Sequence, residues 1–495
     1  MGSPQQVAHV RRNVWTLPAG DLTLTHYAAA VSEMKARDPD DPTGWTYQAA
    51  LHGTGVTPPK PLWNGCKHGS WYFLAWHRMY LWYFERIVRA TVVRLGGPAD
   101  WALPFWDYDA DREQARIPPA FREEQGGANP LFAERANLVN EGEPLPFEIT
   151  SPAYAMGRTL FVGEAEFGGG ITPNGSTFWN RKGALEDTPH NAVHSHIGRW
   201  MGRTTTAALD PVFWLHHANI DRLWFLWSGR TGHSNPDDPR WISQEYKFFD
   251  ADGSRQSLAA SDVLDTAGRL GYTYESPVPI SPPVPLPPSA TRFPVPESTS
   301  GPSGPSAPEP PPPPRRREMA GSSEQPLRLV GRAESIAVPI DRRTTRPLGE
   351  ALGADEPEAD RHVYLNVEDI EGDANPDRVY GIYVNLPEGA SREQAEGHRV
   401  GNLSFFGIER AQDPRGDEHP HGLRVSVEIT PLVRRLQAEG AWDEARLSVT
   451  FRPLGAVAAA AAGRAAQEAA GEADEADEAG EDPPVEIGRV SLSYT

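Results

Sequence analysis

Histidines at helical spacing constrain this chain more than any other feature. His190 and His194 are four residues apart, so on a helix they share one face and can bind the same ion. The segment 210–221 carries the adjacent pair His216 and His217. Adjacent residues lie about 100° apart around a helix, so only one of the two is expected to face that ion. The spacing therefore predicts a metal site shared by two helices.

Three earlier histidines predict a second cluster. His68 precedes a long apolar stretch, His77 lies within it, and His52 ends another helical segment. A single buried histidine is more often a hydrogen-bonded core residue, but several imidazoles buried among Trp and Phe need many partners. No Asp or Glu stands at the obvious ligand positions, which disfavours a carboxylate-bridged hydrolase. Three imidazoles per ion suit copper, although the spacing leaves zinc open.

The first part of the chain predicts a catalytic domain. Residues 1–275 hold 11 of the 15 histidines. Their apolar periodicity indicates a mainly α-helical bundle with long loops. Asp210 followed by Pro211 is typical of a helix start. Helices are expected at residues 22–37, 71–95, 190–200 and 211–227.

The composition changes after residue 275. Residues 276–326 are rich in proline and predict an extended linker. Residues 327–495 alternate in short apolar runs, which predicts a C-terminal β-sandwich domain. Residues 455–484 are Ala-rich and then acidic, which favours a disordered insertion, with a short helix as the alternative. The expected class is a multidomain α+β protein. Strands are expected at residues 362–367, 379–384, 423–428, 446–451 and 490–494.

Charge and composition exclude several partners. The formal net charge of -20 disfavours binding to nucleic acids or to anionic membranes. The sequence contains no run of about 18 apolar residues, so a membrane span is not expected. Cys66 is the single cysteine, so no intrachain disulfide can form. Together with the lack of a visible signal peptide, this predicts a cytoplasmic protein.

The histidine segments match two known motifs. The first motif covers residues 68–85, with His68, Phe73 and His77 at its fixed positions, and the second covers residues 210–221. Together they resemble the two copper signatures of the type 3 copper proteins, which include tyrosinases, catechol oxidases and molluscan haemocyanins. The resemblance implies two copper ions, with O2 as co-substrate. The implied ligands are His52, His68 and His77 for copper A, and His190, His194 and His217 for copper B.

Further residues near the ligands acquire expected roles from this resemblance. Cys66 stands two residues before His68, where many family members form a thioether to that imidazole; a buried free thiol is the alternative. Glu186 and Asn191 occupy the positions credited with holding a water that deprotonates monophenols. The alternatives are structural roles: Glu186 as an acidic residue at a helix N-terminus, and Asn191 as a helix-capping residue.

Two pocket positions bear on selectivity. The family's gate, thirteen residues before the last copper B ligand, is often Phe in plant catechol oxidases and is Thr204 here. Ser195 follows His194 and is a second pocket position. The small gate side chain implies room for bulky phenols.

The ends of the catalytic region and the C-terminal domain extend the resemblance. Residues 10–12 and 272–274 resemble an arginine motif and a Tyr-x-Tyr motif that contact each other in the family. Residues 327–495 resemble the plant domain that covers the active site of latent precursors. This domain is therefore an expected intramolecular inhibitor. Phe405 and Phe406 are candidates for the blocking residue only because they are adjacent aromatics.

The resulting hypothesis is a latent dicopper oxidase of phenolic small molecules. It would hydroxylate monophenols at the ortho position and oxidise o-diphenols to o-quinones. An o-aminophenol oxidase and a haemocyanin-like oxygen carrier are the alternatives, since the signatures do not separate them. The sequence gives no indication of the oligomeric state.

Overall fold

A computed structural model describes residues 9–172, 181–275, 317–341, 362–411, 422–455 and 483–494. Most of the Pro-rich segment and nearly all of the expected insertion at 455–484 lie outside these residues. None of the helices in the described part of the chain is long and apolar enough to cross a membrane.

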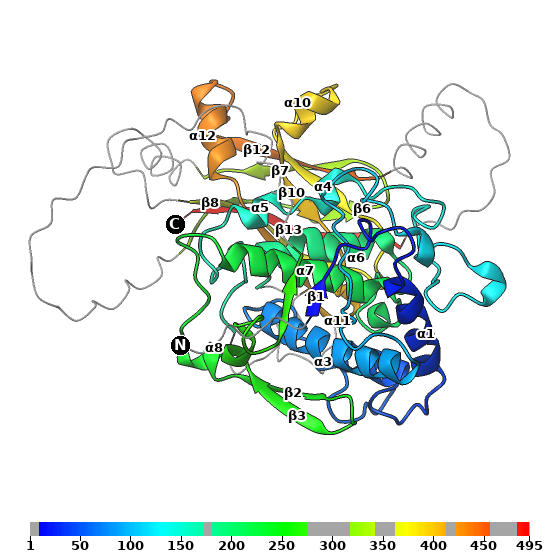
Figure 1. Ribbon diagram of the computed structural model, residues 1–495. Helices are drawn as coiled ribbons and strands as arrows, with labels where there is room; N and C mark the ends of the chain where they lie inside the picture. Colours follow the sequence, from blue (N-terminus) through cyan, green and yellow to red (C-terminus); the bar gives the residue numbers. More distant parts are fainter. Residues whose placement is uncertain are drawn as a thin grey trace, which may run out of the picture.

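Three long helices form the N-terminal region: α1 (Thr23–Lys35), α3 (Phe73–Arg94) and α7 (Val212–Ser228) (Figure 1). Helix α3 contacts both α1 and α7. Each helix begins and ends within two residues of its expected range. Helix α7 is buried over most of its length because it carries apolar residues on every side. Its first turn is held by the Asp210 carboxylate, which accepts a hydrogen bond from the Val212 N–H at 2.9 Å.

The fourth expected helix, at residues 190–200, is shorter than predicted. A π-helical turn, η4 (Glu186–Asn191), leads into α6 (Ala192–Ile197). Gly198 then adopts a φ of +66° and ends the helix. The other short elements of this region are α2 (Trp45–His52), α4 (Phe147–Thr150), α5 (Ala153–Met156), α8 (Pro239–Ile242), β1 (His9–Arg11), β2 (Glu245–Phe249), β3 (Arg255–Ala259) and β4 (Tyr272–Tyr274).

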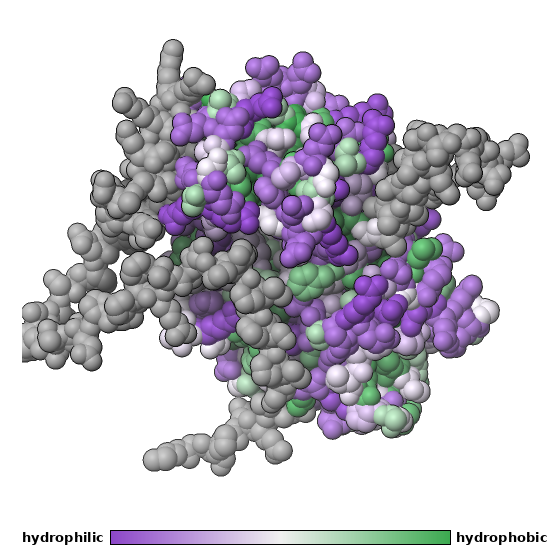
Figure 2. Space-filling view, turned by 90° about the horizontal axis from the view of Figure 1, so that it is seen from above, coloured by the Kyte–Doolittle hydropathy of each residue, from purple (hydrophilic) through white to green (hydrophobic). Residues whose placement is uncertain are grey.

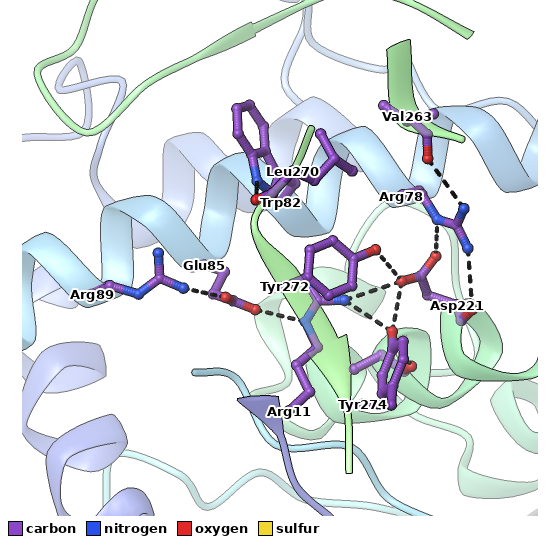
Figure 3. A network of polar contacts seen from close by, with 11 residues as sticks. Arg11, Arg78, Trp82, Glu85, Arg89, Asp221, Val263, Leu270, Tyr272 and Tyr274 are labelled. Carbon is purple, nitrogen blue, oxygen red and sulfur yellow. Dashed lines mark hydrogen bonds and ion pairs between the residues drawn. The ribbon is translucent and has the colours of Figure 1, made fainter. Parts of the chain in front are cut away.

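A buried polar network joins the two ends of the catalytic region (Figure 3). Strand β1 pairs in parallel with β4. Arg11 donates to Glu85 at 2.7 Å and to the Tyr274 hydroxyl at 2.9 Å. The hydroxyls of Tyr272 and Tyr274 each donate to Asp221 at 2.6 Å. Burial alone would raise the pKa of Asp221, but two buried arginines hold it below its usual value. The expected contact between the early arginine and the Tyr-x-Tyr motif is therefore present.

The C-terminal region contains two sheets. One has the strand order β10-β9-β12-β7, and the other has the order β11-β8-β13-β5, with β6 also paired to β13. The five expected strands all appear, because their alternating apolar residues point into one shared core. The strands are β5 (Glu318–Ser322), β6 (Leu327–Leu329), β7 (Glu334–Pro339), β8 (Val363–Glu371), β9 (Tyr380–Val384), β10 (Arg399–Leu403), β11 (Leu423–Glu428), β12 (Arg446–Pro453) and β13 (Val485–Tyr494), and the helices are α10 (Arg392–Glu396), α11 (Ile408–Ala411) and α12 (Thr430–Ala438).

The C-terminal sheet begins earlier than the composition suggests. Strand β5 lies within residues 276–326, which the sequence assigns to the linker, yet it pairs with β13. The proline run ends at Pro314, and the residues that follow it can join a sheet.

The two regions have separate hydrophobic cores. Phe406 and Val379 come from the C-terminal region but are buried in the core of the catalytic region. On the face shown in Figure 2, hydrophilic residues predominate over the described surface and hydrophobic ones form small scattered groups. The contact between the regions is thus made by particular side chains of the C-terminal region.

Candidate metal centre

Six buried histidines converge between α2, α3, η4, α6 and α7. Ligand atoms of His52, His77 and His217 lie within 4.8 Å of one another, and so do those of His190, His194 and His217. The ring of His68 is 5.1 Å from that of His77. Each of the six residues is at most 3% exposed. The structure therefore brings together all six residues that the sequence predicts as ligands.

Four of the rings are oriented in the same way. In each, the Nδ1–H donates to a fixed oxygen, which leaves the Nε2 lone pair facing the site. The acceptors are the carbonyl of Thr204 for His52 (3.0 Å), that of Phe73 for His77 (2.8 Å), the Asn191 side chain for His190 (2.8 Å) and the carbonyl of Met201 for His194 (2.8 Å).

The inward nitrogens suit a metal cation. Nε2 of His52, His77 and His190 is buried and has no hydrogen-bond partner among the described residues. Nε2 of His194 lies 3.2 Å from Nε2 of His217. Buried polar atoms without a partner are costly, and bound metal ions would satisfy them. A donor set of imidazoles without carboxylate is compatible with copper.

Burial keeps the imidazoles neutral. It lowers the pKa of His77 and of His194 to about 3. The pKa of His52, His190 and His217 is also lowered well below its usual value, first by burial and then by neighbouring imidazoles. Neutral imidazole is the form that binds metals, so no proton has to leave the site before an ion enters.

The geometry distinguishes His217 from His216. Both rings lie close to His190 and His194. Only His217 also joins the cluster of His52 and His77, and its ring stacks on that of His77 at 4.7 Å. His217 thus stands between the two clusters, whereas His216 stands at the edge of one; the choice of His217 as the copper ligand stays a prediction.

Cys66 lies beside the copper A cluster. Its sulfur and ligand nitrogens of His52 and His68 lie within 4.8 Å of one another. Burial raises the pKa of the Cys66 thiol. The thioether between Cys66 and His68 stays a prediction.

Glu186 and Asn191 approach the site from η4. Glu186 accepts a hydrogen bond from the Gly69 N–H at 2.7 Å, next to His68 in the chain. Its second oxygen is buried and lacks a partner among the described residues. Burial raises the pKa of Glu186 to about 8. A cation bound nearby would lower this value and favour the carboxylate.

The two pocket positions are fixed in different ways. Thr204 is buried, and its carbonyl holds His52; whether its side chain acts as a gate stays a prediction. The Ser195 hydroxyl accepts hydrogen bonds from the Phe405 N–H at 3.2 Å and from the Asn375 side chain at 3.3 Å. Both donors belong to the C-terminal region, so Ser195 is covered by it.

Phe406 enters the histidine site from the C-terminal region. Its ring stacks on His194 with centroids 4.1 Å apart and an interplanar angle of 14°. It also contacts the rings of His68 and His190, at 5.6 Å each. The neighbouring Phe405 points the other way, into the C-terminal core beside Tyr380. The sequence alone could not show which of the two side chains faces the histidines, because their opposite orientations depend on the turn before α11.

Other contacts between the regions carry no sequence signal. The Asn375 side chain donates to the Gly202 carbonyl at 2.7 Å, and Arg158 pairs with Glu428 at 2.5 Å. Each contact joins residues far apart in the chain. Only the folded arrangement reveals them.

Comparisons with protein families agree with this geometry. Residues 42–164 and 166–230 match the common central domain of tyrosinase. Residues 235–282 match the polyphenol oxidase middle domain, and residues 316–463 match a domain of unknown function.

Individual relatives extend the similarity to nearly the whole chain. Tyrosinase HcTyr1 from Hahella sp. is 35% identical over 478 residues, which cover 90% of this chain and 95% of the relative. Polyphenol oxidase E of Solanum lycopersicum is 28% identical over 88% of this chain and 72% of its own length.

Solved structures share the fold. A latent aurone synthase matches with a TM-score of 0.63 and 20% identity, covering 99% of this chain and 90% of that chain. A latent apple tyrosinase matches with a TM-score of 0.61 and 19% identity, covering 100% of this chain and 98% of that chain.

The expected cytoplasmic location is wrong as an inference from the sequence. Several plant relatives are named as chloroplastic proteins, whereas HcTyr1 comes from a bacterium. Relatives of one family thus occupy different compartments. A single cysteine and the lack of a visible signal peptide therefore do not determine the cellular compartment of a protein with this fold.

Proposed function

Because the chain belongs to the type 3 copper family of tyrosinases and polyphenol oxidases, which are copper-dependent oxidases that use O2, we propose that it oxidises small phenols. It hydroxylates monophenols at the ortho position and converts o-diphenols to o-quinones. The observation that carries the proposal is the convergence of buried, neutral imidazoles whose Nε2 atoms face one site while their Nδ1 atoms are held from behind.

Two groups of three histidines would hold the metals: His52, His68 and His77 for copper A, and His190, His194 and His217 for copper B. Copper bound by these residues would supply O2 activation and electron acceptance. The protein keeps the imidazoles neutral and fixes their orientation through carbonyl groups such as that of Thr204. The aromatic walls exclude water from the site, as Phe73 does beside His77.

Glu186 and Asn191 serve the hydroxylation of monophenols. A monophenol must lose its proton before it reacts, and a carboxylate can accept that proton through a water molecule. Glu186 offers one oxygen held by Gly69 N–H and one that is still available. Asn191 orients His190 through its side-chain oxygen and keeps its amide group for a further contact.

Replacing Glu186 with glutamine tests this role. Glutamine has the same shape and can still accept from Gly69 N–H, but it is no base. We expect monophenol hydroxylation to fall by about 100-fold, within the usual range for losing a general base. Oxidation of o-diphenols, measured in the same preparation, should fall by far less. Equal losses for both substrates, with both coppers retained, would contradict the assignment.

The C-terminal domain acts as an intramolecular inhibitor. The Phe406 ring occupies the face of His194 against which a phenol ring would stack. The part of the C-terminal region that covers the site, residues 375–411, is called the covering segment. Hydrogen bonds from Phe405 and Asn375 to Ser195 hold it in place. A substrate cannot take the same place, so the intact chain is latent.

A substrate panel tests the reaction class. The copper-reconstituted chain ending near residue 280 should form quinone from 4-methylcatechol and hydroxylate tyramine with consumption of O2. The same panel should include o-aminophenol, whose preferred oxidation would favour the alternative activity. Reversible O2 binding without any turnover of phenols or aminophenols would refute an oxidase.

A further inference from the structure

Arg203 lies beside the metal pocket, on the loop between α6, which carries His194, and α7, which carries His217. Two residues before it, the Met201 carbonyl holds His194 at 2.8 Å. The next residue, Thr204, holds His52 through its carbonyl at 3.0 Å. The backbone around Arg203 is therefore fixed on both sides, while its side chain is 54% exposed.

The covering segment presents two groups to this pocket. The Phe406 ring stacks on His194, and the Glu409 carboxylate lies 3.6 Å from Nε of Arg203. Glu409 follows Phe406 by three positions in the chain, so their Cα atoms are at most about 11 Å apart. One short segment thus brings an aromatic ring to the metal pocket and a carboxylate to the arginine beside it.

Burial and several neighbouring charges act on Glu409. Burial raises the pKa of Glu409, and the positive charge of Arg203 opposes that rise most strongly. Asp377 raises the same pKa further, and Arg410 lowers it. Arg410 belongs to the covering segment and leaves with it, as does Asp377. Arg203 remains on the catalytic region when the segment moves away.

We propose that Arg203 selects phenols that carry a carboxylate, and that Phe406 and Glu409 together copy such a substrate. The proposal rests on the oxidase function above and names its substrate class, the aromatic acids with a phenol or o-diphenol ring. The substrate ring takes the place of Phe406 against His194, and its carboxylate takes the place of Glu409. The covering domain therefore competes with the substrate for the ring site and for the charge site.

The net charge of the catalytic region gives a local cation a role. Residues 1–280 contain 25 Lys and Arg and 31 Asp and Glu, a formal net charge of -6, so the catalytic region repels anionic phenols weakly at long range. A positive side chain beside the pocket offsets this repulsion where the substrate enters. The effect is expected to be moderate, because the guanidinium is half exposed and is screened by salt.

The test compares two catechols that differ in charge. The copper-reconstituted chain ending near residue 280 keeps the Arg11 network and the catalytic core apart from Val379 and Phe406. A cooperative thermal unfolding transition of this shortened chain must be measured first, to establish that it folds. Its substrates are 3,4-dihydroxyphenylacetate and 4-methylcatechol. Arg203→Gln should lower the ratio of their kcat/KM values, acid over neutral, about threefold, mainly through KM. Arg203→Lys should retain most of the ratio. Added salt should lower the ratio of the unchanged chain but not that of Arg203→Gln.

Arg199 provides the matched control, since it is an exposed arginine on the same loop. Arg199→Gln should leave the ratio within about 1.5-fold, because exposed charges contribute little without a defined partner. Competitive inhibition by phenylacetate, which is not oxidised, should weaken in Arg203→Gln only. An unchanged ratio in Arg203→Gln, or an equal fall in Arg199→Gln, would overturn the role of Arg203 while normal turnover of 4-methylcatechol left the oxidase function standing. Failure to oxidise either catechol would overturn both.

Discussion

Replacing His217 with alanine should remove one of the two copper ions and lower catechol oxidation by at least about 100-fold. His217 joins both histidine clusters, and its Nε2 lies 3.2 Å from that of His194. Even partners behind a metal ligand contribute 10- to 100-fold to metal affinity or activity, so losing a ligand should cost more. Copper content, measured per chain after reconstitution and dialysis, gives a readout that does not depend on turnover.

His216→Ala is the matched control for this experiment. The two residues are adjacent on α7 and both are buried, so each substitution leaves a similar cavity. The control should keep two coppers per chain, because both histidines lie near His190 and His194 but only His217 also faces His52 and His77 across the centre. Thermal unfolding of both variants checks that each is folded. Loss of copper from His216→Ala but not from His217→Ala would reverse the ligand assignment.

Replacing Phe406 with alanine in the full chain should raise catechol oxidation at least about tenfold without any cut in the linker. The substitution removes the ring that stacks on His194 and leaves a space of the size of a phenol. Truncation of a buried Phe also removes about 3 kcal/mol or more of packing energy, which weakens the seat of the covering domain. Initial rates of quinone formation, with the chain ending near residue 280 as the upper reference, measure the effect.

Phe405→Leu separates opening of the site from general loosening of the domain. Phe405 is buried beside Tyr380 in the C-terminal core, so this change should lower the stability of that domain modestly and leave the chain latent. If Phe406→Ala stays as inactive as the unchanged chain while the shortened chain is active, another residue blocks the site. Equal activation by both variants would assign latency to domain stability instead.

The local signals of the sequence proved sufficient for the three long helices and for five strands of the C-terminal region. Helices α1, α3 and α7 follow an apolar periodicity that local packing preserves, and the strands of the C-terminal region alternate as a shared core requires. The six histidines could be chosen only through the resemblance to the family's two copper signatures, because the spacing alone left His216 and His217 open. Helix α6 was overestimated because Gly198 ends it with a positive φ.

Contacts between distant segments had no such signal. Phe406 and His194 contact each other because the cores of the two regions pack together. The local sequence around either residue gives no sign of this contact. The same holds for Arg203 and Glu409. The start of β5 was misplaced for another reason, since a Pro-rich composition blurs the point at which a chain enters a sheet.

The Ser195 hydroxyl links two properties that could otherwise have changed independently. It follows His194 in the pocket, and it also accepts the Phe405 and Asn375 hydrogen bonds that hold the covering domain. If Ser195 lines the substrate pocket as proposed, we expect a substitution there that changes the range of accepted phenols also to weaken the contact with the covering domain, and the reverse. Variation at this position is therefore constrained from two directions, and descendants of this enzyme with new substrates should carry compensating changes at Asn375.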